Sequence, residues 1–301
     1  MRTRILAFCA LTAMLFACAP KQQTVIRTQV PPRPAGQEDM IQFAAEPIAD
    51  VGIGVVGLGM RGGDAVERLS FVPGCHVAAV CDVEDSRAQA SWKYLADKGL
   101  DTHVYSGGER AYQALCEDPD VDLVYICTDW LHHVPVALYA MEHGKHVAIE
   151  VPSAMTLQDC WDLVDLAEQK RLHCMILENC CYDWFEMNTL NMAQHGVFGE
   201  ILHVQGAYIH NLNEFWDEYW HYWRMEYNRK HRGDIYPTHG LGPIAQLLSI
   251  HRGDRMKTLV AMDTKAVTGP AIIKQTKGET VTDFRNGDHT TTLIRTEQGK
   301  V

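Results

Sequence analysis

The chain has 301 residues and a formal net charge of −11; 47% of its residues are hydrophobic and 22% are charged. This composition is typical of globular proteins and excludes an intrinsically disordered chain. The length is sufficient for two domains of ordinary size. The acidic balance, without any block of lysine and arginine, argues against nucleic-acid binding, because contacts to phosphates need a basic surface.

The N-terminal segment has the pattern of a bacterial export signal. Two arginines precede the apolar run Ile5–Ala17, which is shorter than a helix that spans a bilayer. The run ends in Leu-Phe-Ala-Cys, which is similar to a lipobox, so we expect residues 1–18 to be a lipoprotein signal peptide with the lipid on Cys18. An ordinary cleaved signal and an anchored helix are the alternatives. Residues 19–46 are rich in proline and are expected to be a flexible tether at the bacterial cell envelope, on the outer-membrane or periplasmic side.

From residue 47 onward, short apolar runs alternate with helical stretches, which indicates a parallel sheet built from βαβ units. We therefore predict an α/β domain over residues 47–180 with the doubly wound Rossmann arrangement. Its six strands are expected at Ile53–Val56, Val77–Cys81, His103–Tyr105, Leu123–Cys127, His146–Ile149 and Cys174–Leu177.

The pattern changes after residue 180, and residues 181–301 are predicted to form an α+β second domain with a mostly antiparallel, open sheet. The aromatic and charged stretch Phe215–Arg232 has no clear period and is expected to form a loop or short helices over a site. The chain stops at what looks like the middle of a hairpin, so this domain is expected to be incomplete. Helices are predicted at Trp184–Gln194 and Gly242–Ile250, and strands at Gly199–Gly206, Thr258–Met262 and Thr290–Arg295.

The first predicted strand runs directly into a glycine turn with the pattern Gly-x-Gly-x-x-Gly, followed by a helix. Gly57 would allow the tight turn, Gly59 the close approach of a pyrophosphate, and Gly62 the close packing of helix on strand. Met60 and Arg61 open the helix and are expected to bind the cofactor. Arg61 could argue for NADP, but at the helix start it is expected to meet the pyrophosphate. Because the turn stands between a strand and a helix, it predicts a dinucleotide site far more specifically than glycine spacing alone.

Asp82 ends the second predicted strand, where a carboxylate accepts hydrogen bonds from ribose hydroxyls and repels a 2′-phosphate. The predicted cofactor is therefore NAD rather than NADP; a simple turn residue is the alternative for Asp82. No metal site is predicted, because the fifteen histidines are scattered and neither His-x-x-x-His nor Cys-x-x-Cys occurs.

Three further segments resemble the glucose–fructose oxidoreductase/inositol dehydrogenase (Gfo/Idh/MocA) superfamily. Thr128–His133 is similar to its Thr-Pro-x-x-x-His turn, Gly144–Pro152 to its Gly-Lys-His-Val…Glu-Lys-Pro segment, and Gly196–Ile201 to the opening of its substrate domain. The resemblance implies that the nicotinamide side of the cofactor is lined by Trp130, Leu131, His132, His133, Glu150, Val151 and Asn179.

Two departures from that superfamily weaken the prediction of an ordinary dehydrogenase. The lysine of Glu-Lys-Pro, which exchanges a proton with the sugar hydroxyl, is Val151 here, and the aspartate expected four residues before His239 is Ile235. The replacements instead look like glycoside hydrolase family 109, the NAD-dependent α-N-acetylgalactosaminidases. The segments that carry this resemblance are Glu178–Tyr182, Trp223-Arg224 and Gly233–Pro243.

The resemblance implies an unusual glycosidase route, since most glycosidases use two carboxylates. Bound NAD would take a hydride from sugar C3, the acidified C2 proton would be removed, and the C1 substituent would leave. Water would then add and the hydride would return, so that no net oxidation occurs.

The resemblance also implies roles for side chains. His239 suits the base that acts on the C3 hydroxyl, because histidine exchanges protons near neutral pH. Tyr182 is the candidate base for C2 and would need cationic or donor neighbours to act at neutral pH. The residues expected to contact the sugar are Tyr208, Arg224, Tyr236, Pro237, Thr238 and His239.

Two other functions stay open on the sequence alone. One is an NAD-dependent sugar or polyol dehydrogenase that releases NADH, and the other is a non-catalytic lipoprotein that binds sugar or NAD. The expected partners are a glycan or small sugar substrate and, through Cys18, a membrane. The superfamily often pairs through the open sheet of its second domain, so a homodimer is a further expectation.

Overall fold

The computed structural model describes residues 26–301, so the expected signal peptide, Cys18 and the start of the expected tether lie outside the described residues. The chain divides into two units at Gln37, and all described helices and strands belong to the second unit, Glu38–Val301. Within residues 26–301, no helix combines the length and the apolar character needed to cross a membrane.

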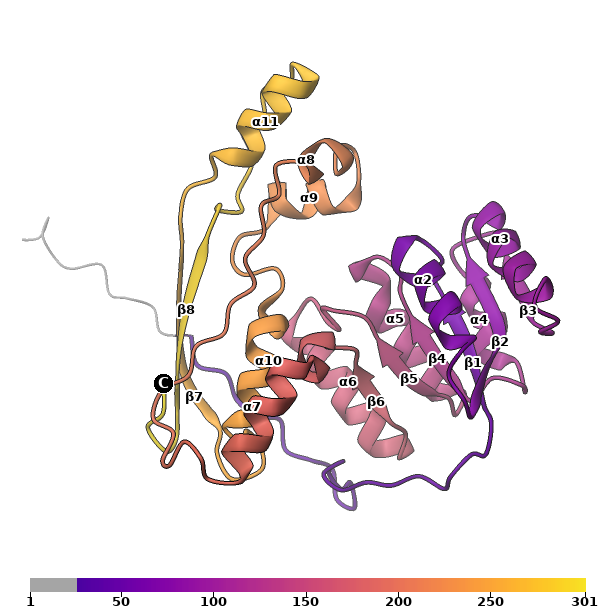
Figure 1. Ribbon diagram of the computed structural model, residues 1–301, viewed down its shortest axis with the longest axis horizontal. Helices are drawn as coiled ribbons and strands as arrows, with labels where there is room; N and C mark the ends of the chain where they lie inside the picture. Colours follow the sequence, from indigo (N-terminus) through magenta and orange to yellow (C-terminus); the bar gives the residue numbers. More distant parts are fainter. Residues whose placement is uncertain (1–25) are drawn as a thin grey trace, which may run out of the picture. The chain divides into compact units, whose positions relative to one another are not determined.

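The predicted Rossmann arrangement is confirmed. Six parallel strands lie in the order β3-β2-β1-β4-β5-β6, so that the order reverses between β1 and β4 (Figure 1). The strands are β1 Val51–Val56, β2 Cys75–Asp82, β3 His103–Ser106, β4 Leu123–Ile126, β5 His146–Ile149 and β6 Cys174–Ile176. The connecting helices are α2 Met60–Leu69, α3 Asp85–Ala96, α4 Ala111–Glu117, α5 Trp130–Glu142 and α6 Leu157–Lys170.

Two apolar cores lie on the two faces of this sheet. One packs the strands against α2 and α3, with Val66 and Leu95 fully buried, and the other packs them against α4, α5 and α6. The strands are rich in valine and alanine on both faces, as expected for a parallel sheet that is covered by helices on each side. The carboxyl ends of β1, β2, β4 and β5 therefore meet at one edge of a rigid layer.

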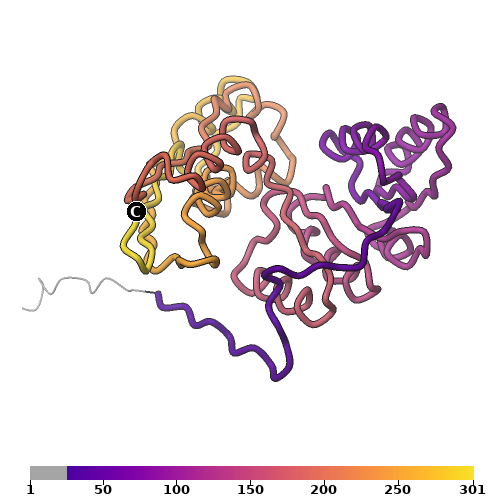
Figure 2. Tube along the Cα trace, turned by 60° about the horizontal axis from the view of Figure 1, so that its bottom comes forward, coloured from indigo at the N-terminus to yellow at the C-terminus, as the bar shows by residue number. Residues whose placement is uncertain are grey.

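Part of the expected tether, residues 19–46, contacts the Rossmann domain in the structure. Residues 38–46 contact the end of the sheet: the Arg171 guanidinium donates to the carbonyls of Glu38 and Asp39 at 3.0 and 2.9 Å. The same guanidinium lies over the Phe43 ring, 4.6 Å from its centre. Figure 2 shows the indigo segment that leads into the Rossmann domain. The Phe43 ring and two backbone carbonyls hold this segment in place. The proline content, on which the prediction of a tether rested, does not reveal these contacts.

The second part of the chain contains helices and one antiparallel strand pair, β7 with β8. The predicted short helices in the aromatic stretch are present as α8 and α9. The elements are the 3-10 helix η1 Asn179–Tyr182, α7 Trp184–Gln194, α8 Phe215–Glu218, α9 Trp223–Lys230, α10 Pro237–Leu247, β7 Met256–Asp263, α11 Thr268–Lys277 and β8 Thr290–Thr296. The predicted antiparallel sheet of the second domain is confirmed and has two strands in the described residues.

Two predictions for this part are wrong in detail. Gly199–Gly206 is not a strand, because its backbone forms only two hydrogen bonds with Val301 and pairs with no neighbouring strand in the described residues. The helix α11 was not predicted, since a threonine, a glycine and a proline at its start resemble a turn. Its first turn is capped from a distance: the carboxylate of Asp288 accepts the backbone N–H and the hydroxyl of Thr268.

Candidate functional site

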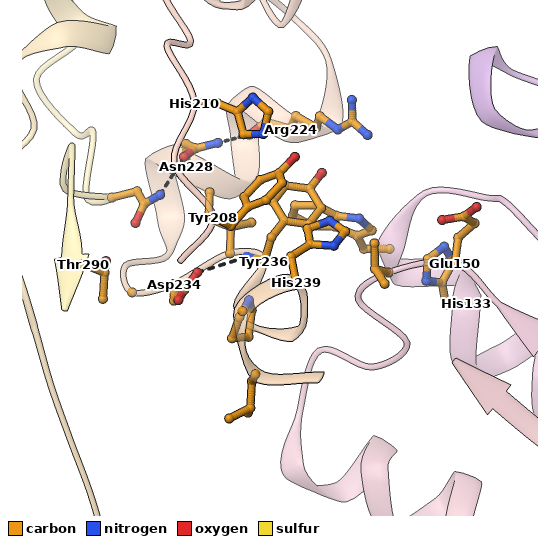
Figure 3. Close-up of a pocket in the computed structure, with 18 of the residues that line it drawn as sticks. His133, Glu150, Tyr208, His210, Arg224, Asn228, Asp234, Tyr236, His239 and Thr290 are labelled. Atoms are coloured by element: carbon orange, nitrogen blue, oxygen red, sulfur yellow. Dashed lines mark hydrogen bonds between the residues drawn. The ribbon is translucent and has the colours of Figure 1, made fainter. Parts of the chain in front are cut away.

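A cleft of about 2000 Å³ lies beside the carboxyl ends of the Rossmann strands. Its lining comes from the glycine turn, from the loops after β2, β4 and β5, and from segments 203–212, 222–241 and 286–294 of the second part. Figure 3 shows the centre of this cleft, with His133 and Glu150 on the Rossmann side and Thr290 of β8 on the opposite side. The volume exceeds that of most small-ligand pockets and suits a dinucleotide together with a sugar.

The glycine turn fits a pyrophosphate. Gly57 has a φ of +88°, and a Cβ there would lie 2.7 Å from the backbone of Cys127. A Cβ on Gly62 would lie 1.7 Å from the Gly57 carbonyl oxygen, so only glycine lets α2 pack this closely. At Gly59, by contrast, a Cβ would meet nothing within 4 Å. Gly59 is the N-cap residue of α2 and has no side chain to accept the first backbone N–H groups of the helix. These N–H groups are therefore available to bind an anion.

Asp82 lies at the edge of the cleft and is only 5% exposed. Its carboxylate accepts the backbone N–H of Leu58 at 2.6 Å and that of Glu84 at 2.8 Å. These bonds fix the carboxylate against the glycine turn. Because a carboxylate has about four acceptor positions, two remain for ribose hydroxyls. The residues therefore fit an NAD ribose, and Asp82 also has a structural bond that the motif does not reveal.

Most of the residues predicted to bind the cofactor line the cleft, and two do not. His133 is buried and bridges two loops, with Nδ1 2.8 Å from the Pro152 carbonyl and Nε2 3.1 Å from the Thr128 carbonyl. Burial lowers the pKa of His133, whereas the hydrogen bonds to the two carbonyls act in the opposite direction. Glu150 and Arg61 form an ion pair of 3.4 Å at the cleft. Of the other predicted residues, Met60, Trp130, His132 and Val151 line the cleft, whereas Leu131 and Asn179 do not.

Trp130 connects the two halves of the cleft. It begins α5 in the Rossmann domain, and its ring packs edge-on against Trp223, Tyr227 and Tyr236 of the second part, with centre separations of 4.6, 5.0 and 5.2 Å. Such edge-to-face pairs add to the apolar burial of the rings. Trp130 is 5% exposed, so it acts mainly as the aromatic contact that holds α9 beside the cofactor loops.

His239 lines the cleft and forms a buried pair with Glu178, which was not predicted. His239 Nδ1 lies 2.6 Å from Oε1 of Glu178, and the two side chains are 7% and 4% exposed. The same oxygen accepts the Cys180 backbone N–H at 3.1 Å. A carboxylate oxygen at this distance accepts a proton from Nδ1, so the neutral form of the ring has its lone pair on Nε2. This geometry is the arrangement of an oriented general base.

Close packing of α10 on η1 makes this pair possible. A Cβ on Gly242 would lie 2.8 Å from the Cys181 sulfur and 2.9 Å from Cγ of Glu178. On the other side of α10, a Cβ on Gly206 would lie 2.5 Å from the Gly240 carbonyl oxygen. The glycines of the His-Gly-Leu-Gly-Pro segment thus let the helix approach both neighbours, which brings His239 within reach of Glu178.

Two tyrosines lie against the His239 ring. The ring centres of Tyr208 and Tyr236 are 4.4 and 5.7 Å away, and Figure 3 shows the three rings together. Burial raises the pKa of Tyr236 to about 12 and raises that of Tyr208 as well, so both phenols stay protonated and can donate hydrogen bonds. Arg224 lies over Trp223, and its buried Nε has no partner among the described residues. These groups offer donors to a polyhydroxylated ligand.

The remaining predicted residues lie outside the cleft lining. Tyr182 ends η1 and is 56% exposed, and it is not among the residues that line the cleft. Thr238 is likewise absent from the lining, although Pro237 and His239 on either side of it line the cleft. Glu178 was not predicted as a site residue. The sequence could have indicated it, however, because Glu178 is the charged residue directly after the sixth predicted strand, in the Glu-Asn-Cys-Cys-Tyr segment.

Comparisons with known proteins agree with this architecture. Residues 51–177 match the family model "Oxidoreductase family, NAD-binding Rossmann fold", and residues 182–301 match "Glycosyl hydrolase 109, C-terminal domain". Glycosyl hydrolase family 109 protein 4 of Phocaeicola vulgatus is 53% identical over the whole chain, which covers 62% of that relative. Family 109 protein 1 of Bacteroides thetaiotaomicron is 59% identical over 91% of the chain and 59% of its own length. The chain thus spans about three fifths of these relatives.

Solved structures support the fold. The scyllo-inositol dehydrogenase of Lactobacillus casei with bound NAD(H) and scyllo-inositol has a TM-score of 0.63 at 16% identity, covering 83% of this chain and 67% of that one. A probable dehydrogenase from Thermotoga maritima has a TM-score of 0.60 at 19% identity, covering 83% and 66%.

The matched Rossmann model and the geometry of the glycine turn confirm NAD as the cofactor. The two matched domains, together with relatives of 53–59% identity, also confirm the resemblance seen in the signature segments. The chain belongs to glycosyl hydrolase family 109.

Proposed function

We propose that this protein is a glycosidase that hydrolyses terminal α-N-acetylgalactosamine by oxidation, elimination, addition and reduction, without net redox change. The observation that carries the proposal is the buried His239–Glu178 pair, whose histidine lines the same cleft as the dinucleotide turn. NAD, when bound, supplies reversible hydride acceptance at a carbohydrate carbon. The chain supplies the proton transfers and the binding of the sugar.

In this proposal His239 accepts the proton of the sugar C3 hydroxyl at Nε2. Glu178 holds Nδ1–H and stabilises the imidazolium that forms. The low exposure of both side chains excludes bulk water from the pair and strengthens their interaction. When the hydride returns, the same imidazolium gives the proton back, so that His239 is unchanged after each turnover.

The positions that carry acid–base groups in dehydrogenases are apolar here. Val151 and Ile235 both line the cleft, and Val151 is 8% exposed. Neither side chain exchanges protons, so the cleft lacks these two groups of the dehydrogenase pattern. This favours a glycosidase over a polyol dehydrogenase that releases NADH.

Tyr208, Tyr236 and Arg224 would bind the sugar as hydrogen-bond donors, because both phenols stay protonated and the guanidinium Nε is unpartnered. Tyr182 stays the candidate for removal of the C2 proton by resemblance alone. Its exposed position at the end of η1 means that this role would require its side chain to turn toward the cleft.

The test uses a nitrophenyl α-N-acetylgalactosaminide and the NAD-loaded chain in deuterated water. A glycosidase of the proposed kind releases nitrophenol without net NADH and places deuterium at C2 of the product. Accumulation of NADH would show a dehydrogenase instead, and release without C2 label would refute the elimination route. His239→Ala should abolish turnover while NAD is retained, as measured by mass spectrometry of the purified variant. If the parent chain shows neither activity, the proposal of catalysis by this chain is refuted.

We also propose that the protein is exported and held at the cell envelope by a lipid on Cys18. The support is the lipobox-like sequence at the end of the apolar run. Pairing of two copies through the β7–β8 sheet stays a prediction.

A further inference from the structure

Three side chains with metal-binding atoms meet at the catalytic pair. They are Glu178, Cys180 and His239, and their ligand atoms all lie within 4.8 Å of one another. Cys180 Sγ is 3.5 Å from His239 Nδ1, and Cys180 is a free thiol. The sequence hides this cluster, because 59 residues separate Cys180 from His239.

One atom of the cluster is without a partner. Oε2 of Glu178 is buried and accepts no hydrogen bond among the described residues, whereas Oε1 of the same carboxylate accepts two. An unpaired oxygen on a buried carboxylate is costly, since it has lost its water and gained nothing in return. The site therefore offers a carboxylate oxygen, a sulfur and an imidazole nitrogen at one point.

The spacing suits a tetrahedral cation with mixed ligands. Zinc–sulfur and zinc–nitrogen bonds of about 2.3 and 2.05 Å at a tetrahedral angle place sulfur and nitrogen about 3.6 Å apart. The observed separation of Sγ and Nδ1 is 3.5 Å. The 2.6 Å bond between Nδ1 and Oε1 would have to lengthen, and the unpartnered Oε2 is the ligand that can take its place.

We propose that a thiophilic divalent cation of the zinc type binds Glu178, Cys180 and His239 and thereby switches off the base. Binding replaces the proton of the Cys180 thiol, which is released to solvent, while the imidazole proton moves from Nδ1 to Nε2. The ring stays neutral and gains a metal bond, but Nε2 no longer has a lone pair for a substrate proton. The inhibitory consequence rests on the proposed function, whereas the binding itself does not.

Cobalt(II) is the probe, because a cobalt–thiolate bond gives a near-ultraviolet charge-transfer band. We expect one equivalent of Co²⁺ to develop the band in the reduced 301-residue chain, and Zn²⁺ to abolish it. Cys180→Ala should lose the band, and the adjacent Cys181→Ala is the matched control that keeps it. Glu178→Gln should weaken binding by about tenfold or more, since even changes outside the ligand shell cost about 10–100-fold.

A chain without the band, or a band that persists in Cys180→Ala while the variant retains its circular dichroism, would overturn the site. The inhibition is tested on nitrophenyl glycoside cleavage, with each variant compared with its own metal-free rate. Zinc should inhibit the parent and Cys181→Ala at the concentration that displaces cobalt, and should inhibit Cys180→Ala at least tenfold less strongly. A cobalt band in a chain without glycosidase activity would refute the proposed function and support the metal site. Activity without a band would do the reverse.

Discussion

Replacing Glu178 by glutamine tests whether a charge, rather than shape alone, orients His239. The carboxylate oxygen that accepts Nδ1–H also accepts the Cys180 amide, so the glutamine oxygen can keep both bonds. The new NH2 group then occupies the place of Oε2, where the described residues offer no partner. The variant therefore retains the geometry and removes the negative charge that stabilises the imidazolium.

The magnitude follows from the 2.6 Å contact between two nearly inaccessible side chains. Hydrogen bonds to a charged partner contribute about 1.5–3 kcal/mol, against about 1 kcal/mol for neutral ones. The glutamine keeps the bond and loses only its charge, so the cost is the difference, about 0.5–2 kcal/mol. Since about 1.36 kcal/mol corresponds to tenfold in rate, kcat should fall roughly 2- to 30-fold. The kcat of Glu178→Ala should be lower still, because His239 Nδ1 and the Cys180 amide both lose their acceptor.

The assay is steady-state cleavage of a nitrophenyl α-N-acetylgalactosaminide, with NAD content measured for each variant. We expect KM and NAD retention to change little in Glu178→Gln. Glu186→Gln, which removes a carboxylate from the neighbouring helix α7, is the control for a general change of charge near the site. A Glu178→Gln variant with kcat within twofold of the parent and full NAD content would refute the reasoning.

Three further predictions address the turn, the surface and the N-terminus. Gly62→Ala should lower the free energy of unfolding by about 1–3 kcal/mol and lose NAD, because its Cβ has no room. Gly59→Ala should melt like the parent and only bind NAD more weakly. Equal melting temperatures and equal NAD content in the parent and both variants would contradict this. The hydrogen bond and ion pair with Asp118 raise the pKa of His103, so the stabilisation is present below about pH 6.5 and is lost as the pH rises through the folded-state value. His103→Gln should therefore lower the free energy of unfolding, measured in denaturant melts, by under about 1 kcal/mol at pH 5.5 and by less at pH 8.5. A larger loss at pH 8.5 than at pH 5.5 would contradict this prediction. Cys18→Ser should move the expressed protein from the membrane fraction to the soluble fraction, and an unchanged distribution would exclude the lipid anchor.

The Rossmann domain was predictable because its signals are local. Each strand is a short apolar run with a polar boundary, and the turn between Val56 and Met60 contains Gly57, which its backbone requires, and Gly59. Strand order then follows from the handedness of βαβ units and the shortness of their connections. The cofactor residues that depend only on this order, such as Gly59 and Asp82, therefore lie at the cleft as expected.

The second part was harder, since its elements depend on distant partners. The first turn of α11 is capped by Asp288, which lies 20 residues away, so no pattern near Thr268 announces a helix. The predicted strand at Gly199–Gly206 has the correct alternation but no neighbouring ladder among the described residues. Alternation predicts which face a strand would bury and cannot supply the strand beside it.

The sequence by itself determined the dinucleotide turn, the family signatures and His239 as the residue to examine. Only the tertiary structure decided which group orients that histidine. Glu178 and His239 are 61 residues apart, and they meet because Gly242 lets α10 approach η1 closely enough for a 2.6 Å contact. The structure likewise placed Tyr182 outside the cleft lining, since its side chain projects from the exposed end of η1. A motif specifies side chains along one segment, whereas a proton relay needs two segments held at hydrogen-bond distance by packing.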